Sequence, residues 1–249
     1  MSRQLRSELL KQRTTRSTLI LLAWMLGLIL LVVLLHALAL NASDLAKASN
    51  QPKVYGWGTS IGALFAALLG ALGVTSEIRT GTIRPTLLAT PNRTVVIAAK
   101  AGAGALAGLL IGLTAEALVA AIASAGLAIR GIHITLSAGD FAQMLAGGAL
   151  AAALWAAIGT GIGALVRNQV GAVVGLCVWL LLVESILIGD VPSAAKFSPG
   201  ASAGALAGMI QNISGGSLLT SALGALLLAV YAVAAAAAGA IVTERRDIN

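Results

Sequence analysis

The fold is decided by long apolar segments, of which the first is the clearest. Residues 19–40 read LILLAWMLGLILLVVLLHALAL and lie in a charge-free interval from 17 to 43. A helix needs roughly 20 apolar residues to cross the ~30 Å hydrocarbon layer of a bilayer. This stretch therefore predicts a membrane-spanning helix over 18–40.

The composition extends this prediction to the whole chain. Of its 249 residues, 58% are hydrophobic and 10% are charged, whereas a soluble domain carries about 25% charged residues. The 29 glycines and the low aromatic content of 4% are typical of helices packed closely in lipid. Apolar residues occur in unbroken runs and not in period-two alternation, which excludes a transmembrane β-barrel. We expect an all-α polytopic membrane protein and exclude soluble, disordered and disulfide-rich classes.

Further charge-poor intervals predict six spans in one transmembrane domain over 1–249. The other five are expected at 55–76, 101–129, 141–166, 169–189 and 218–243. Residues 197–210 form an apolar stretch of only 14 residues, a length more typical of re-entrant or interfacial segments than of spans. We expect a re-entrant outer segment over 197–216, with a seventh span as the alternative.

The distribution of basic residues predicts the orientation. With six spans both termini lie on one side, and 12 of the 16 basic residues fall on that side. Basic residues concentrate in cytoplasmic loops, so both termini are expected in the cytoplasm. The net charge of +7 is then explained by topology and anionic lipid, and no nucleic-acid partner is expected.

Residues for catalysis are scarce. A nucleotide-binding P-loop needs G-x-x-x-x-G-K-[ST], and none of the five lysines follows a glycine. The two histidines, His36 and His133, lie in different segments, and Cys177 is the single cysteine. No metal-ligating cluster is expected from such residues. We therefore expect no catalytic residue, no metal and no cofactor in this chain, and His133 as an ordinary loop residue.

The loop 77–100 between the second and third spans contains helix-stop and helix-start signals. Gly81 suits the end of a helix, Thr82 suits the cap of a new one, and Pro91 suits a stop. These signals predict a short helix from about Ile83 to Ala89. A solvated basic loop is the alternative that spacing alone leaves open.

This loop resembles the signature of the type-2 ATP-binding-cassette (ABC) exporter permeases. The matching positions are Glu77, the pair Gly81-Thr82, the pair Leu87-Leu88, Pro91, Arg93 and Lys100. Residues 6–18 are similar to the start of such permeases, especially actinobacterial-looking ones. Residues 197–201 resemble the outer re-entrant segment of the family.

The resemblance implies a membrane subunit of a bacterial exporter in the plasma membrane. It would pair with a second copy or a related permease and with separate ATPase subunits that hold ATP and Mg. The helix in the loop would be the coupling helix that contacts the ATPase. Its contact residues would be Glu77, Arg79, Gly81, Thr82, Leu87, Leu88, Pro91 and Arg93. Residues 1–17 would form an interfacial connecting helix with Glu8, Lys11, Arg13 and Arg16. Drugs, peptides, lipids and ions all remain open as substrates.

Glu116 and Glu184 are the only acidic residues well inside the predicted spans. A charge at the bilayer centre costs about 2.5–3.5 kcal/mol on insertion scales, so such residues usually face a cavity or a partner. Both are candidates for a translocation path, and a hydrogen bond to a neighbouring helix is the structural alternative. A proton-coupled antiporter that uses both glutamates is the alternative function, and a non-transporting scaffold or immunity protein is a third.

Small residues recur at helical spacing inside the predicted spans. Gly104, Gly108 and Gly112 are four residues apart in the third span, and Gly58, Gly62 and Gly70 follow a similar register in the second. The pairs Gly159/Gly163 and Gly171/Gly175 show the same spacing in the fourth and fifth spans. Faces of this kind allow helix backbones to approach closely in lipid. We expect them to be packing faces.

Overall fold

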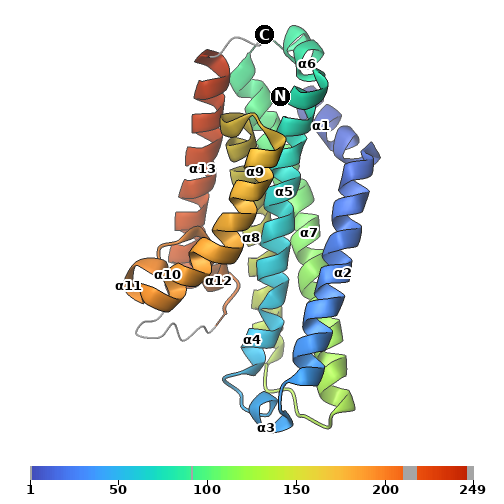
Figure 1. The fold of residues 1–249 in the computed structure, drawn as a ribbon, viewed down its shortest axis with the longest axis vertical. Coiled ribbons are helices and arrows are strands. Elements are labelled where there is room, and N and C mark those ends of the chain that lie inside the picture. Colours follow the sequence, from blue (N-terminus) through green and yellow to red (C-terminus); the bar gives the residue numbers. More distant parts are fainter. Residues whose placement is uncertain (1, 91, 210–217, 246–249) are drawn as a thin grey trace.

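Every regular element in the described part of the chain is helical. The computed structural model describes residues 2–90, 92–209 and 218–245 (Figure 1). Its helices are α1 (Ser2–Thr14), α2 (Arg16–Ala39), α3 (Ala42–Leu45), α4 (Gln51–Tyr55), α5 (Trp57–Thr80), α6 (Ile83–Ala89), α7 (Arg93–Ile129), α8 (Ala138–Val166), α9 (Gln169–Val178), the π-helix η1 (Trp179–Val183), α10 (Glu184–Asp190), α11 (Pro192–Ala195), α12 (Pro199–Leu206) and α13 (Ser221–Arg245). Pro91 and residues 210–216 of the expected re-entrant segment lie outside the described residues.

The prediction of six apolar helices is confirmed within the described residues. The helical segments long and apolar enough to cross a membrane are Arg16–Ala39, Gln51–Thr80, Arg93–Ile129, Ala138–Val166, Gln169–Asp190 and Ser221–Arg245. The third begins at Arg93, so residues 93–100, expected in a loop, are the first turns of α7. The side chain of Asn92 caps this helix by accepting a hydrogen bond from the Val95 N–H at 3.1 Å.

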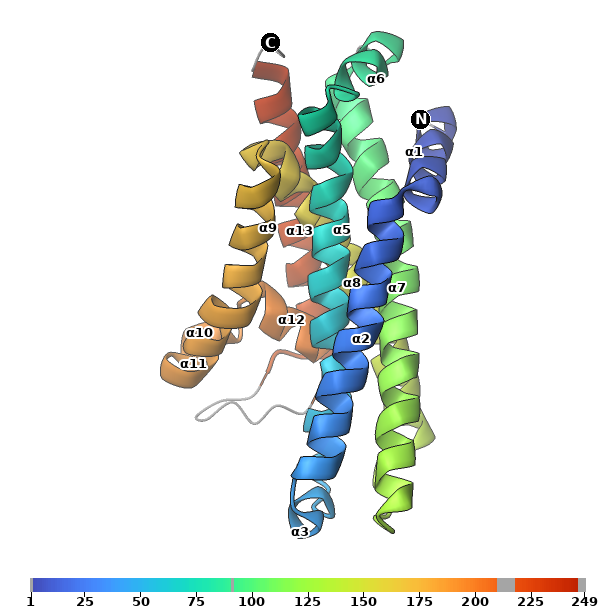
Figure 2. The ribbon, with the colours of Figure 1, turned by 45° about the vertical axis from the view of Figure 1, so that its right-hand side comes forward.

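The helices form a bundle with α5, α7 and α8 at its centre. These three pack on one another, α13 packs on α8, and α2 packs on α5 and α7 (Figures 1 and 2). In both views α1, α6 and the end of α13 lie at one end of the bundle, and α3 lies at the other. The first and last described helices therefore lie at the same end of the bundle, as expected when six long helices alternate in direction.

The central helices meet backbone to backbone. A Cβ atom added to Gly159 of α8 would lie 1.9 Å from the Ala67 carbonyl oxygen of α5, and one added to Gly70 would lie 2.0 Å from the Ala156 carbonyl oxygen. In the third span, a Cβ on Gly112 would come within 2.7 Å of α8. Since lipid provides no hydrophobic drive between helices, such contacts supply dispersion energy instead. The glycine faces predicted in the second, third and fourth spans are thus packing faces, but the pair Gly171/Gly175 predicted in the fifth span is not, because a Cβ on Gly175 meets nothing within 4 Å.

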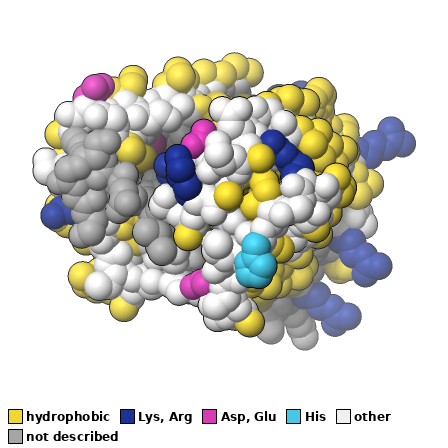
Figure 3. All heavy atoms as spheres, turned by 90° about the horizontal axis from the view of Figure 1, so that it is seen from below, with side chains coloured by type: hydrophobic (Ala, Val, Ile, Leu, Met, Phe, Trp, Pro, Cys, Tyr) yellow, Lys and Arg dark blue, Asp and Glu magenta, His cyan; other side chains and the backbone are white. Residues whose placement is uncertain are grey.

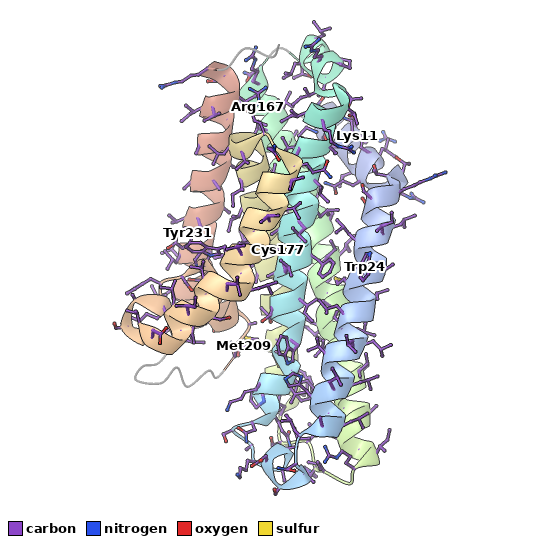
Figure 4. The ribbon with its side chains drawn as sticks, in the orientation of Figure 1. Lys11, Trp24, Arg167, Cys177, Met209 and Tyr231 are labelled. Atoms are coloured by element: carbon purple, nitrogen blue, oxygen red, sulfur yellow. The ribbon has the colours of Figure 1, made fainter. Side chains whose placement is uncertain are left out.

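The outside of the bundle is apolar. Trp24, Leu110 and Val233 are among many large hydrophobic side chains that are exposed, and Figure 4 shows Trp24 on the outer side of α2. Figure 3, a view from the end that carries α3, shows apolar side chains along much of the outline. Exposed apolar surface of this extent is unfavourable in water and is compatible with a lipid environment.

A buried glutamine organises the connections at the α3 end. The amide nitrogen of Gln51 donates to the carbonyl oxygens of Leu45 and His133 at 3.2 and 2.8 Å. Its amide oxygen accepts from both the backbone N–H and the hydroxyl of Thr135 at 2.9 Å. His133 itself is an exposed loop residue, as expected from the sequence. Gln51 therefore joins the loops that precede α5 and α8.

The contact between α5 and α8 predicts the effect of one added methyl group. We expect Gly159→Ala to destabilise the protein by about 1–3 kcal/mol, the usual cost of overpacking, because the Cβ would overlap the Ala67 carbonyl. Gly175→Ala is the matched control, since a Cβ there meets nothing within 4 Å and alanine favours helix. Thermal unfolding in detergent, followed by circular dichroism, measures both. Equal melting temperatures would contradict the packing.

Candidate functional site

Four charged side chains from three helices meet at the end of the bundle that carries α6. The Nζ atom of Lys100 in α7 lies 2.7 Å from Glu8 Oε2 in α1 and 2.8 Å from Glu77 Oε1 in α5. The Nζ atom of Lys11 lies 2.7 Å from Glu8 Oε1 and 2.9 Å from the same Glu77 Oε1. We call these four residues the ion cluster. Figure 4 shows Lys11 between α1 and α5.

The ion cluster is buried and electrically balanced. The side chains of Lys100, Glu8 and Glu77 are 3%, 6% and 12% exposed, and that of Lys11 is 40% exposed. Lys100 also donates to the Gly73 carbonyl oxygen at 3.2 Å, so each of its three N–H groups has an acceptor. Buried charges persist only where they are paired and hydrogen-bonded, and the ion cluster meets both conditions.

Lys11 is the most exposed member, and its environment favours the charged form. Burial alone would lower its pKa, but hydrogen bonds from its ammonium to Glu8 and Glu77, together with the charges of these carboxylates, raise the pKa above 10.5. Lys11 therefore keeps its positive charge throughout the physiological pH range.

The inward face of α1 is polar, which the sequence did not suggest. Gln4 donates to Glu8 at 3.3 Å and accepts from the Thr90 hydroxyl at 3.3 Å. Lys11 lies 3.5 Å from the Thr86 hydroxyl oxygen. The residues at positions 4, 8 and 11 follow helical spacing and share one face of α1. This spacing is the sequence pattern from which the polar face could have been predicted. Polar side chains thus connect α1 to α6.

The short helix predicted after the second span is present as α6. Gly81 ends α5 in the left-handed region with φ of +73°, which favours glycine. Thr82 is the N-cap residue of α6, as expected, but its side chain makes no cap hydrogen bond, and its hydroxyl pairs with the Thr80 hydroxyl at 2.9 Å. On α6 itself, Ile83 is buried while Leu88 is 83% exposed.

The predicted ATPase-contact residues occupy different environments. Glu77 belongs to the ion cluster. Arg93 donates to the carbonyl oxygens of Thr243 and Glu244 in α13 at 2.7 and 3.4 Å. The exposed members are Arg79, Gly81, Thr82 and Leu88, Leu87 is half-buried, and Pro91 lies outside the described residues. Of the predicted connecting-helix residues, Glu8 and Lys11 belong to the ion cluster, while Arg13 and Arg16 are exposed.

A cavity of about 680 Å³ adjoins the ion cluster. Its walls come from α1, the start of α2, the second half of α5 and the start of α6, with single contributions from Lys100, Thr160 of α8 and Gln169 of α9. Hydroxyl-bearing residues are frequent in the lining, at positions 15, 17, 18, 76, 80, 82, 86 and 160. The volume lies in the range of small-molecule sites.

Glu116 lies in a separate niche inside the bundle. It is buried, and its Oε1 accepts a hydrogen bond from the Thr59 hydroxyl at 2.5 Å. Two glycines make room for the carboxyl group, because a Cβ on Gly58 or Gly148 would lie 2.4 or 1.9 Å from its oxygens. Its hydrogen bond to α5 is the structural alternative raised from the sequence, and a role in translocation stays a prediction.

Glu184 occupies a second niche, at the start of α12. Its Oε1 accepts from the Trp179 indole N–H at 2.9 Å and from the Gly200 backbone N–H at 2.7 Å. Ser198 caps the same helix by accepting from the Ala201 N–H at 3.2 Å. Glu184 therefore satisfies one of the free N–H groups of a buried helix start. Neither Glu184 nor Glu116 lines the cavity beside the ion cluster.

Comparison with known proteins leaves the family open. A search of the sequence against protein-family models finds no match, and a search against curated proteins finds none. The site must therefore be interpreted from its own geometry.

Removal of the ammonium of Lys100 should strongly reduce the stability of the protein. Lys100→Met would leave two buried carboxylates with only Lys11 as counter-charge, so we expect a loss of about 3 kcal/mol. Release of α1 should also accelerate tryptic cleavage at Arg6 and Arg13. Thermal unfolding and limited proteolysis in detergent measure the two effects.

Lys47→Met is the matched control for this variant. Lys47 forms an exposed pair with Asp44 at 2.8 Å, and exposed pairs contribute little. No measurable change is expected from it. A Lys100 variant that behaved like the Lys47 variant would contradict the structural role of the ion cluster.

Proposed function

We propose that the chain is the membrane-spanning permease subunit of an ABC exporter. It would move a drug, peptide, lipid or ion out of the cytoplasm with ATP hydrolysed by separate subunits. In this proposal α6 is the coupling helix, α1 the connecting helix and α12 the outer re-entrant segment. The observation that carries it is a short protruding helix with an exposed apolar residue, anchored to the bundle beside a buried ion cluster.

The contacts of α6 would allow a movement of this helix to be transmitted to the membrane-spanning helices. The helix follows α5 through Gly81, precedes α7, and reaches α1 through the polar contacts of Thr86 and Thr90. The ion cluster holds α1, α5 and α7 together, and breaking one buried pair is costly. A force applied to α6 would therefore move these helices as one unit.

As such a permease, the chain would have a defined membrane, orientation and set of partner subunits. The protein would lie in a bacterial plasma membrane with both termini in the cytoplasm, as the basic residues suggest. ATP and Mg would bind to the ATPase subunits, and a second copy or a related permease would complete the transporter. The antiporter alternative receives no comparable support, since Glu116 and Glu184 lie in separate niches with partners of their own.

A substitution of the exposed Leu88 tests whether α6 binds an ATPase subunit. We expect Leu88→Asp to abolish capture of a P-loop ATPase when the tagged protein is purified from its native membrane. A central apolar contact contributes about 2 kcal/mol or more, which is roughly 30-fold in affinity. Mass spectrometry of the purified complex measures the ratio of ATPase to permease.

Ile129→Asp is the control for this experiment. Ile129 is 84% exposed, like Leu88 at 83%, but ends α7 at the opposite end of the bundle. Its ATPase ratio should equal that of the wild-type protein. Equal ratios in the two variants, or no P-loop ATPase with the wild-type protein, would refute the proposed partner.

The side of the membrane is tested by cysteine labelling. In a Cys177→Ser background, a membrane-impermeant maleimide should label Ser43→Cys in intact cells and Ala89→Cys only after the cells are opened. Both native side chains are exposed, Ser43 on α3 and Ala89 on α6. Labelling of Ala89→Cys from outside would place α6 on the wrong side for an ATPase and overturn the proposal.

A further inference from the structure

The cavity beside the ion cluster gathers hydrogen-bond acceptors that have no donor. Four buried side-chain polar atoms lack a hydrogen-bond partner within the described residues, and three of them are oxygens of residues that line this cavity. They are Gln12 Oε1 from α1, Glu77 Oε2 from α5 and Gln169 Oε1 from α9. Unsatisfied buried acceptors are costly and rare in native proteins. Their gathering around one cavity points to a ligand that donates hydrogen bonds.

The two lysines that line the cavity do not supply these donors. The ammonium of Lys100 is committed to Glu8, Glu77 Oε1 and the Gly73 carbonyl. That of Lys11 is committed to Glu8, Glu77 Oε1 and Thr86. Each ammonium carries three N–H donors, so neither has one left for Glu77 Oε2. A primary ammonium from outside carries N–H donors that these acceptors lack.

The other residues of the lining indicate which chemical groups the ligand carries besides the ammonium. Arg16 and Arg79 are exposed residues of the same cavity, with no ion pair within the described residues, and guanidinium groups suit phosphate oxygens. Leu21, Leu69 and Leu72 add apolar wall where the cavity meets the spans. Acceptors, guanidinium groups and leucines together match an ammonium linked to a phosphate and an apolar tail.

We propose that this cavity binds a phosphoethanolamine group, with the ammonium on the three acceptors and the phosphate on the two arginines. The apolar wall favours phosphatidylethanolamine over the free headgroup as its source. This proposal is independent of the ATPase partner, because it concerns binding by the isolated permease chain. Failure of the Leu88 experiment would leave it standing, and its own failure would leave the exporter assignment standing.

Phosphatidylcholine provides a sharp test. Its trimethylammonium keeps the charge and the phosphate but has no N–H donor. We expect the purified full-length chain, exposed to equal amounts of the two lipids in detergent, to retain phosphatidylethanolamine with at least about tenfold preference, since a site built for N–H donors rejects analogues that lack them. Native mass spectrometry counts the bound lipids. Equal retention of both lipids, or retention of neither, would overturn the proposal.

Two pairs of variants locate the site. Gln12→Met with Gln169→Met should remove the preference for phosphatidylethanolamine, whereas Gln143→Met should preserve it, because Gln143 pairs with Ser221 away from this cavity. Arg79→Gln should weaken retention of both lipids, whereas Arg84→Gln, outside the lining, should not. Circular dichroism verifies that each variant is folded. An unchanged preference in the folded glutamine double variant would overturn the assignment.

A soluble competitor distinguishes the two sources of the headgroup. O-phosphoethanolamine carries the same ammonium and phosphate without the apolar tail. We expect it to displace phosphatidylethanolamine only at a large molar excess, because it loses the contacts of the leucines. Displacement at equal concentrations would assign the site to a soluble amine and overturn the lipid source.

Discussion

The structure depends on a lysine ammonium that is buried between two carboxylates. Lys100 lies in the first turns of α7, where it is 3% exposed and pairs with Glu8 and Glu77. A charge in this position is tolerated only with counter-charges in direct contact. This requirement holds α1 against the bundle, although α1 has little apolar surface of its own. Within the bundle the helices pack through glycine contacts, whereas at the proposed cytoplasmic end α1, α5 and α7 are held together by ion pairs.

Glu77 connects the structural anchor with the cavity. One of its oxygens accepts from both lysines of the ion cluster, and the other is a buried acceptor with no partner among the described residues. An ammonium in the cavity would bring a third positive charge to this carboxylate and weaken its hold on Lys11 and Lys100. Ligand binding and the attachment of α1 would thus be linked through one side chain. Such linkage is reciprocal, so movement of α1 and α6 would change the affinity of the cavity.

The acidic residues inside the spans have local structural explanations. Glu116 fits between two glycines and pairs with Thr59, and Glu184 caps the start of α12. A carboxyl group in a span suggests transport when it is considered alone. Here the glycines on the facing helices show that space was left for each carboxyl group. Facing glycines of this kind let a carboxyl group fit between closely packed helices.

The sequence alone predicted the six apolar helices, the glycine faces of the central helices and the short helix after Gly81. Each depends on local properties: the length of an apolar run, helical spacing, and the left-handed conformation that glycine adopts. The ion cluster was not predicted, because Glu8, Glu77 and Lys100 come from distant segments. The cavity and its acceptors also come from several helices at once. Local chemistry specifies which segments are helices, whereas the pairing of buried charges is decided only when those helices pack together.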